Sequence, residues 1–220
     1  MHGAIWMLSY DVAVAASSRY LDWFHNVHIP EKLARPGYTW ATHYAGPPSV
    51  TTDDGGERCG YIAMFGGEST RTFLDPSPAQ LKLTQDALTR EMMGMREHPL
   101  VMILAHEWSD SRTAEAIAQV SSPGLGLWCA DAPQRDEQIG AWCAQELAPG
   151  LIAQADCLRL HKLSNVMAGP RHALVQELSD VTPSAQTPLA PGELGAVLAP
   201  HTQISMRYGT RIWPALTGNS

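Results

Sequence analysis

Histidines are the side chains of this sequence best suited to proton transfer near neutral pH, and His25 and His28 lie close together. An imidazole titrates near neutrality, so a positioned histidine can act as a general acid or base. Residues three apart on a helix share a face, so these two can serve one site. A metal would need a third ligand, and none is evident, so we predict no metal. The structural alternative is a histidine that satisfies carbonyls and the dipole at a helix end.

A third histidine, His43, lies in a predicted strand, where side chains alternate between two faces. In a later strand, Leu158 and Leu160 must face their helices, which places Arg159 and His161 on the interior face. The stretch ending at His43 aligns with the stretch ending at His161, so the same parity predicts that His43 points inward. Such buried groups are costly unless they are hydrogen-bonded or meet a ligand. We expect the polar end of a pocket for an acidic or carbonyl-bearing substrate; an internal polar network is the alternative.

Aromatic side chains can form the walls of a pocket for a planar ligand, and seven tryptophans are many for 220 residues. For each tryptophan, ordinary core packing is the alternative. The catalytic candidates are His28, His43 and His25, and the substrate-binding candidates are Arg159, His161, Trp40, Trp23, Tyr10, His106 and Trp108.

Eight strands and several helices are predicted to position these residues. Serines at 17–18 and at Ser77 can cap helices, and Pro30 must kink or end the first helix. The predicted strands are 3–10, 38–44, 60–67, 99–108, 125–131, 157–163, 172–178 and 202–213. The predicted helices begin near Arg19, run over about 79–97 and 134–148, and include a short proline-broken one at 183–200.

The element order is β-α-β-β-α-β, twice, which is typical of ferredoxin-like α+β halves. We assign one half to 1–110, a linker to 111–124 and a degenerate half to 125–220. Each half would leave one apolar sheet face bare. Two halves packed sheet to sheet would cover both faces, which predicts an intramolecular α/β barrel that encloses a single small-molecule cavity.

The segment 22–31, together with the strand 38–44, resembles the dimeric α/β-barrel proteins of the EthD and muconolactone-isomerase type. The matching residues are Trp23, His28, Pro30, Pro36 and Gly37. Usual members are half this length and dimerise, so this chain looks like the dimer in one polypeptide. The second half lacks a histidine-proline pair. When His43 is aligned with His161, Glu146 takes the place of His28.

The resemblance implies a cofactor-free isomerase, cyclase, lyase or monooxygenase acting on a small aromatic or lactone-like substrate, with histidine as acid or base. Our first hypothesis is a lyase or isomerase in which His28 and His43 exchange a proton and Arg159 holds a carboxylate or enolate. Haem-binding relatives share the scaffold, so a haem-dependent oxidative enzyme is the second hypothesis. A non-catalytic small-molecule binder is the third.

Bulk properties exclude several other classes of function. The formal net charge is -7 and no basic cluster is present, which disfavours nucleic acid and anionic membranes as partners. No run approaches the roughly 18 apolar residues of a spanning helix. The N-terminus suggests a strand rather than a signal peptide, and the four cysteines form no CxxC pair, so we expect a cytoplasmic protein with reduced thiols. Glycine-rich phosphate loops, GxSxG and HExxH are absent, and further homodimerisation is left open.

Overall fold

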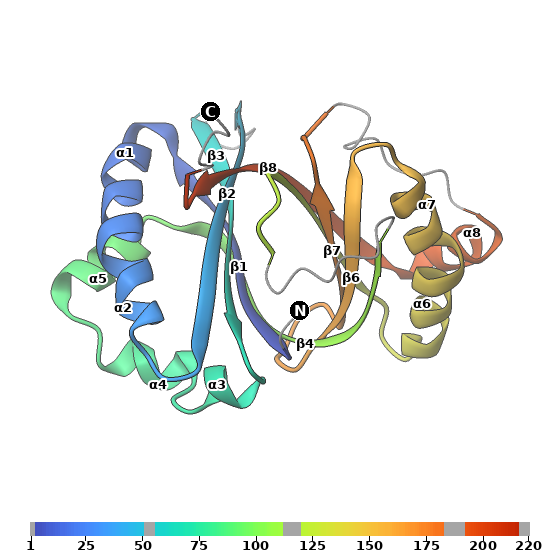
Figure 1. The fold of residues 1–220 in the computed structure, drawn as a ribbon, viewed down its shortest axis with the longest axis horizontal. Coiled ribbons are helices and arrows are strands. Elements are labelled where there is room, and N and C mark those ends of the chain that lie inside the picture. Colours follow the sequence, from blue (N-terminus) through green and yellow to red (C-terminus); the bar gives the residue numbers. More distant parts are fainter. Residues whose placement is uncertain (1–2, 51–55, 112–119, 183–191, 216–220) are drawn as a thin grey trace.

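Eight strands carry the fold in the computed structural model, which describes residues 3–50, 56–111, 120–182 and 192–215. They are β1 (Ala4–Ala13), β2 (Tyr38–Val50), β3 (Glu57–Gly67), β4 (Glu97–Ser111), β5 (Gly124–Asp131), β6 (Cys157–Asn165), β7 (His172–Leu178) and β8 (Gln203–Trp213). All pair antiparallel in a closed barrel, in the order β1-β3-β2-β8-β5-β7-β6-β4. The prediction of an α+β barrel built from two ferredoxin-like halves is confirmed (Figure 1).

The helices lie outside the barrel, one group against each half (Figure 1). The first half has α1 (Val14–Trp23), the π-helix η1 (Phe24–His28), α2 (Ile29–Leu33), α3 (Arg71–Leu74), α4 (Pro78–Leu83) and α5 (Ala87–Met93). The second half has α6 (Asp136–Trp142), the π-helix η2 (Cys143–Leu147), α7 (Ala148–Ala153), α8 (Glu193–Leu198) and the 3₁₀ helix η3 (Ala199–His201). Within the described ranges, no helix combines the length and the apolar character needed to cross a membrane.

The two halves close the barrel through two strand pairs, β2 with β8 and β4 with β6. Apolar side chains from both sheets fill the space between them and form a shared core. Its larger members are Ile5, Met7, Trp40, Tyr44, Ile62, Met64, Met102, Leu104, Leu125, Leu127, Leu163 and Val175. A pocket of about 210 Å³ remains between the halves, lined by Ser9 and Leu100 of the first half and by Leu127, Cys129 and Ser205 of the second. The expectation of a ligand cavity between the halves therefore stays a prediction. The bare sheet faces are covered mainly by each other's aliphatic side chains.

Each half also has a core between its sheet and its own helices. In the first half this core is aromatic and includes Tyr10, Tyr20, Trp23, Phe24 and Tyr61. In the second half it is mainly aliphatic. The outer layer of the first half is thus where aromatic side chains gather.

A π-helical turn interrupts the long helix of each half at matching places. The N–H of Ile29 bonds to the carbonyl of Phe24, and the N–H of Ala148 bonds to the carbonyl of Cys143. Each turn is followed by a proline, Pro30 or Pro149. A proline inside a helix cannot donate and clashes with the carbonyl four residues earlier, and a widened turn relieves that clash. The predicted interruption at Pro30 takes this form rather than an end of the helix.

Helix boundaries differ from the predictions in three places. The first helix begins at Val14 without a side-chain cap, because Ser17 donates to the carbonyl of Ala13 within it. The predicted helix over 79–97 is two short helices, since Asp86 caps a new start by accepting from the N–H of Thr89. The second-half helix continues past 148 to Ala153. Ser77 does cap α4, as predicted, while the linker 111–124 and the segment before α8 lie largely outside the described residues.

Candidate functional site

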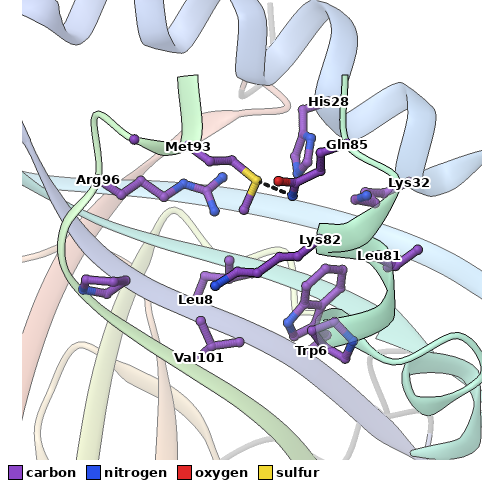
Figure 2. Close-up of a pocket in the computed structure, with 13 residues that line it drawn as sticks. Trp6, Leu8, His28, Lys32, Leu81, Lys82, Gln85, Met93, Arg96 and Val101 are labelled. Atoms are coloured by element: carbon purple, nitrogen blue, oxygen red, sulfur yellow. Dashed lines mark hydrogen bonds between the residues drawn. The ribbon is translucent and has the colours of Figure 1, made fainter. Parts of the chain in front are cut away.

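A cavity of about 280 Å³ lies between the sheet and the helices of the first half (Figure 2). Its floor comes from β1 and β4, and its walls come from η1, α2, α4, α5 and the turns that follow. The lining residues are Trp6, Leu8, His28, Lys32, Pro78, Leu81, Lys82, Gln85, Met93, Gly94, Arg96, Pro99 and Val101. A smaller pocket of about 170 Å³ shares Lys32, Leu81 and Gln85 with it and includes the exposed residues Glu31 and Asp86. The cavity therefore continues toward the surface.

His28 is the one imidazole of this cavity, and it is 3% exposed. Its ring stacks on Phe24 with centroids 5.3 Å apart and lies 4.7 Å from the ring of Trp23. Its Nδ1 is buried without a hydrogen-bond partner. Burial, followed by the charges of Arg96 and Lys32, lowers the pKa of His28 to about 2. The imidazole is neutral at physiological pH, fixed in orientation, and has a free nitrogen.

The cavity is positively charged. Lys32, Lys82 and Arg96 line it, and no lining residue is acidic. Lys32 is 6% exposed, and burial lowers its pKa. The Arg96 guanidinium lies 4.8 Å from the centroid of the Tyr10 ring, and its Nη2 is buried without a partner. Lys32 Nζ lies 3.6 Å from the carboxylate of Glu31, so the unpartnered Nη2 of Arg96 is the group that favours a ligand with a negative charge.

A second group of side chains lies behind the cavity wall. Tyr10 Oη is 3.0 Å from His43 Nε2, and His43 Nδ1 is 2.8 Å from His25 Nε2. Arg96 donates from Nε to the hydroxyl of Tyr20 at 2.8 Å, and the Tyr20 ring lies 5.7 Å from the Tyr10 ring. Burial lowers the pKa of His43 well below its usual value and raises that of Tyr10. The group forms a neutral hydrogen-bonded chain from half-exposed His25 to buried Tyr10.

The prediction that His43 points into the barrel is wrong. His43 is fully buried on the helix side of β2, 4.7 Å from the ring of Phe24, while Trp40 and Tyr44 face the barrel. The alternation along the strand was right, but its phase was not. Pairing Pro30 with Pro149 shifts the alignment by one residue, so that Thr42 rather than His43 matches His161. A one-residue shift exchanges the two faces of a strand.

The substrate-binding candidates are divided among three places. Trp23 and Tyr10 lie with His25, His28 and His43 in the outer layer of the first half, and Trp40 belongs to the barrel core. Arg159 and His161 lie on the barrel side of β6, as predicted, with His106 6.1 Å from His161. Trp108 packs against the helices of the second half. One pocket holding all ten candidates is therefore excluded.

The second half has no equivalent of His28. With the corrected alignment, Leu147 takes its place and is buried in the aliphatic core. Glu146, which the first alignment placed there, instead accepts hydrogen bonds from the N–H groups of Leu194 and Gly195 at the start of α8. Its carboxylate stabilises a helix end.

Four polar residues of the cavity were missed by reasoning from the sequence: Lys32, Lys82, Gln85 and Arg96. Lys32 follows His28 by one helical turn, so the spacing alone could have placed it on the same face. Gln85 and Arg96 were assigned to one long helix over 79–97. That helix is in fact broken, and the break turns both side chains toward the cavity. We recognised no feature of the sequence that predicts the break.

The structure allows a test of whether these residues suit haem. Both ring nitrogens of His43 and of His161 already have partners, so neither is free to bind iron. His28 has a free nitrogen, but its cavity is near the lower end of the roughly 300–1,000 Å³ range of small-molecule sites. That volume suits one or two rings better than a macrocycle of four, so the residues of this cavity do not fit haem. Among the described residues, no three histidine, cysteine, aspartate or glutamate side chains are placed to hold a metal ion.

Comparison with known proteins identifies the fold. No protein-family model matches the sequence. No curated protein matches it significantly. Three solved structures align with 96% of the chain: an anthrone oxidase-like protein (10% identity, 92% of that chain, TM-score 0.54), a protein of Lactobacillus acidophilus NCFM provisionally named a monooxygenase (11%, 94%, 0.47), and a chlorite dismutase mutant from Candidatus Nitrospira defluvii (10%, 91%, 0.45). Only the first TM-score exceeds 0.5. It supports the conclusion that the chain has the ferredoxin-like α/β-barrel fold over nearly its whole length.

Proposed function

We propose that this protein is a cofactor-independent enzyme that moves a proton on a small, largely apolar anion bound in the first-half cavity. The observation that carries the proposal is the pairing of His28, with its free buried Nδ1, and three cationic side chains around an otherwise apolar space. An aromatic or lactone-like carboxylate suits both the volume and the charge. The reaction class is that of a lyase or isomerase of the EthD and muconolactone-isomerase type.

The ligand's own charge would activate His28. In the free protein the pKa of His28 is about 2, so the imidazole is a weak base. An anion about 4 Å from the ring would stabilise the imidazolium by roughly 4 kcal/mol at an effective dielectric constant of about 20. That energy raises the pKa by roughly three. The anion also offsets the charges of Arg96 and Lys32 that depress the pKa of His28. His28 would therefore become an effective base only when substrate is bound.

The remaining residues would hold the substrate and the developing charge. Removing a proton next to a carbonyl leaves an enolate, which Lys32 and Arg96 can stabilise from the cavity wall. Phe24 lies between His28 and His43, with its ring 5.3 Å and 4.7 Å from the two imidazoles. We therefore assign His43 a positioning role, through Tyr10 and His25, rather than the direct proton exchange expected from the sequence.

Hydrogen exchange in D₂O tests the proposal without knowledge of the net reaction. Aryl ketones and butenolides that carry a carboxylate, together with their methyl esters, would be incubated with the protein, and loss of the α-proton signal would be followed by NMR. We expect exchange of at least one carboxylate and not of its ester. His28→Gln should slow exchange by about 10²–10⁴-fold, the usual contribution of a general base.

The matched control is His98→Gln, which removes an exposed histidine outside the cavity and should leave the exchange rate unchanged. Full exchange by His28→Gln would contradict the assignment of the base. Binding of a carboxylate without any exchange would favour the non-catalytic binder instead. A Soret band in haem-supplemented protein would favour the oxidative alternative.

A further inference from the structure

A chain of polar side chains lies on the barrel side of the second half, apart from the first-half cavity. It begins at a bulge in β4, where Glu107 is an extra residue between His106, which is opposite Leu163, and Trp108, which is opposite Lys162. In a regular strand, residues three apart point to opposite faces. The bulge turns both His106 and Ser109 toward the barrel side, where Ser109 is opposite His161.

Three short contacts join these residues. Ser109 Oγ is 2.7 Å from His161 Nδ1, and His161 Nε2 is 2.7 Å from Glu177 Oε1. His106 Nε2 lies 2.7 Å from the same Ser109 Oγ. His161 and Glu177 are each 1% exposed, whereas Ser109 is exposed. A buried histidine-carboxylate pair thus ends at the hydroxyl of an exposed serine.

The contacts determine which atoms carry protons. A carboxylate only accepts, so the neutral ring of His161 donates from Nε2 to Glu177 and its Nδ1 accepts from the Ser109 hydroxyl. His106 then donates from Nε2 to Oγ. Burial lowers the pKa of His161, while Glu177 opposes this effect, so the ring is neutral and able to accept a proton at pH 7.

Stability alone does not account for this arrangement. A buried ion pair is often no better than two apolar residues of similar volume. The first half shows that the barrel does not need the pair, because Thr42 takes the place of His161 there. Arg159, directly opposite Glu177 in the sheet, adds a compensating positive charge.

We propose that Ser109 is a nucleophile that accepts the acyl group of a small carboxylic ester, with His161 as its general base and Glu177 as the residue that positions His161. Oγ forms a bond to the carbonyl carbon while its proton moves to His161 Nδ1. The bond from that carbon to the alcohol oxygen then breaks, and Nδ1 returns the proton to the departing alkoxide. Water releases the acid by the same steps, and its proton restores the hydroxyl of Ser109.

A fluorophosphonate probe tests this site, because it reacts with activated serines and displaces fluoride. The full-length protein would be treated with the probe, and the modified peptide identified by mass spectrometry. We expect one label, on Ser109, which Ser109→Ala abolishes and Ser69→Ala, at an exposed serine of the first half, does not affect. Ser109 is exposed, so its loss should leave the protein folded. No label, or a label that survives Ser109→Ala, would overturn the proposal.

The roles of His161 and Glu177 have separate readouts. His161→Gln should slow labelling by about 10²–10⁴-fold. Labelling should become faster as pH rises through the pKa of His161, because only the neutral ring accepts a proton. Glu177 raises that pKa, so Glu177→Gln should move the midpoint of the pH profile to lower pH as well as slow the reaction. An unchanged midpoint in Glu177→Gln would show that Glu177 has only a structural role.

Discussion

His28 is held in a state that costs stability when the pH falls. Its side chain is 3% exposed between two aromatic rings, and its pKa is lowered to about 2 by burial and nearby cations. In the unfolded chain its pKa would be near 6.5. Below that pH the unfolded state binds a proton that the folded state does not, so folding stability decreases as the pH decreases. A residue kept under such a penalty is a candidate for function.

The penalty at His28 can be measured by urea unfolding at pH 7.5 and pH 5.5. The wild type should lose stability over this interval, and His28→Gln should lose on the order of 1 kcal/mol less, the contribution of one histidine with these two pKa values. Val27→Ala changes an exposed neighbour on the same turn and should behave like the wild type. Equal losses in His28→Gln and the wild type would mean that His28 is not buried as a neutral ring.

The π-helical turns are the local elements that orient the side chains of the site. Both halves contain a proline at the same place after the turn, but only the first half has a histidine within it. The widened turn also separates the directions of His25 and His28. His25 reaches His43 and His28 faces the cavity, although a regular helix would place them on one face. The expectation that they share one face of the helix was therefore wrong.

Replacing Pro30 and Pro149 one at a time distinguishes the effect of the π-helical turn on side-chain geometry from its effect on stability. Pro30→Ala restores an N–H donor and permits a regular helix, which would rotate His28 away from the cavity. Alanine favours the helix by about 3 kcal/mol relative to proline. The more flexible unfolded chain costs roughly 1 kcal/mol, so the stability of the folded protein should not fall. In Pro30→Ala we expect the rate of D₂O exchange to fall at least tenfold, because a misplaced base is less effective. Pro149→Ala should retain the wild-type rate. Equal activity of the two variants would contradict a role for the turn.

The strands and their order could be predicted from the sequence, because apolar runs, turn residues and the repeated βαββαβ pattern all indicate the same fold. The face on which His43 lies could not be predicted in the same way. Alternation along a strand shows that neighbouring side chains point to opposite faces, but only a correct alignment of the two halves shows which face is which. Trp23 with Trp142, and Pro30 with Pro149, give the correct phase. The cavity itself depends on Arg96 and Gln85, which approach His28 only through packing between distant segments.

In the molecule as a whole, the barrel sheet has two surfaces that could hold a ligand, one facing the barrel interior and one facing the helices. The surface shared by the halves is mostly aliphatic, and the outer layer of the first half holds the cavity and its cations. The cavity that combines His28 with cationic side chains lies on the helix side of the first half. The proposed proton-transfer site therefore lies in the outer layer of the first half, whereas the proposed ester site at Ser109 lies on the barrel side.

Histidine ring ¹⁵N signals measure this location most directly, because His28 lies on the helix side of the sheet and His161 lies on the barrel side. The wild type at pH 7 would be titrated with 2-naphthoate and with 2-naphthylmethylammonium, with His28 assigned from the spectrum of His28→Gln. We predict that the anion shifts the His28 signals toward a protonated ring and leaves those of His161 unchanged, and that the cation shifts neither. Shifts at His161 with none at His28 would contradict a site in the outer layer and place the anion in the barrel.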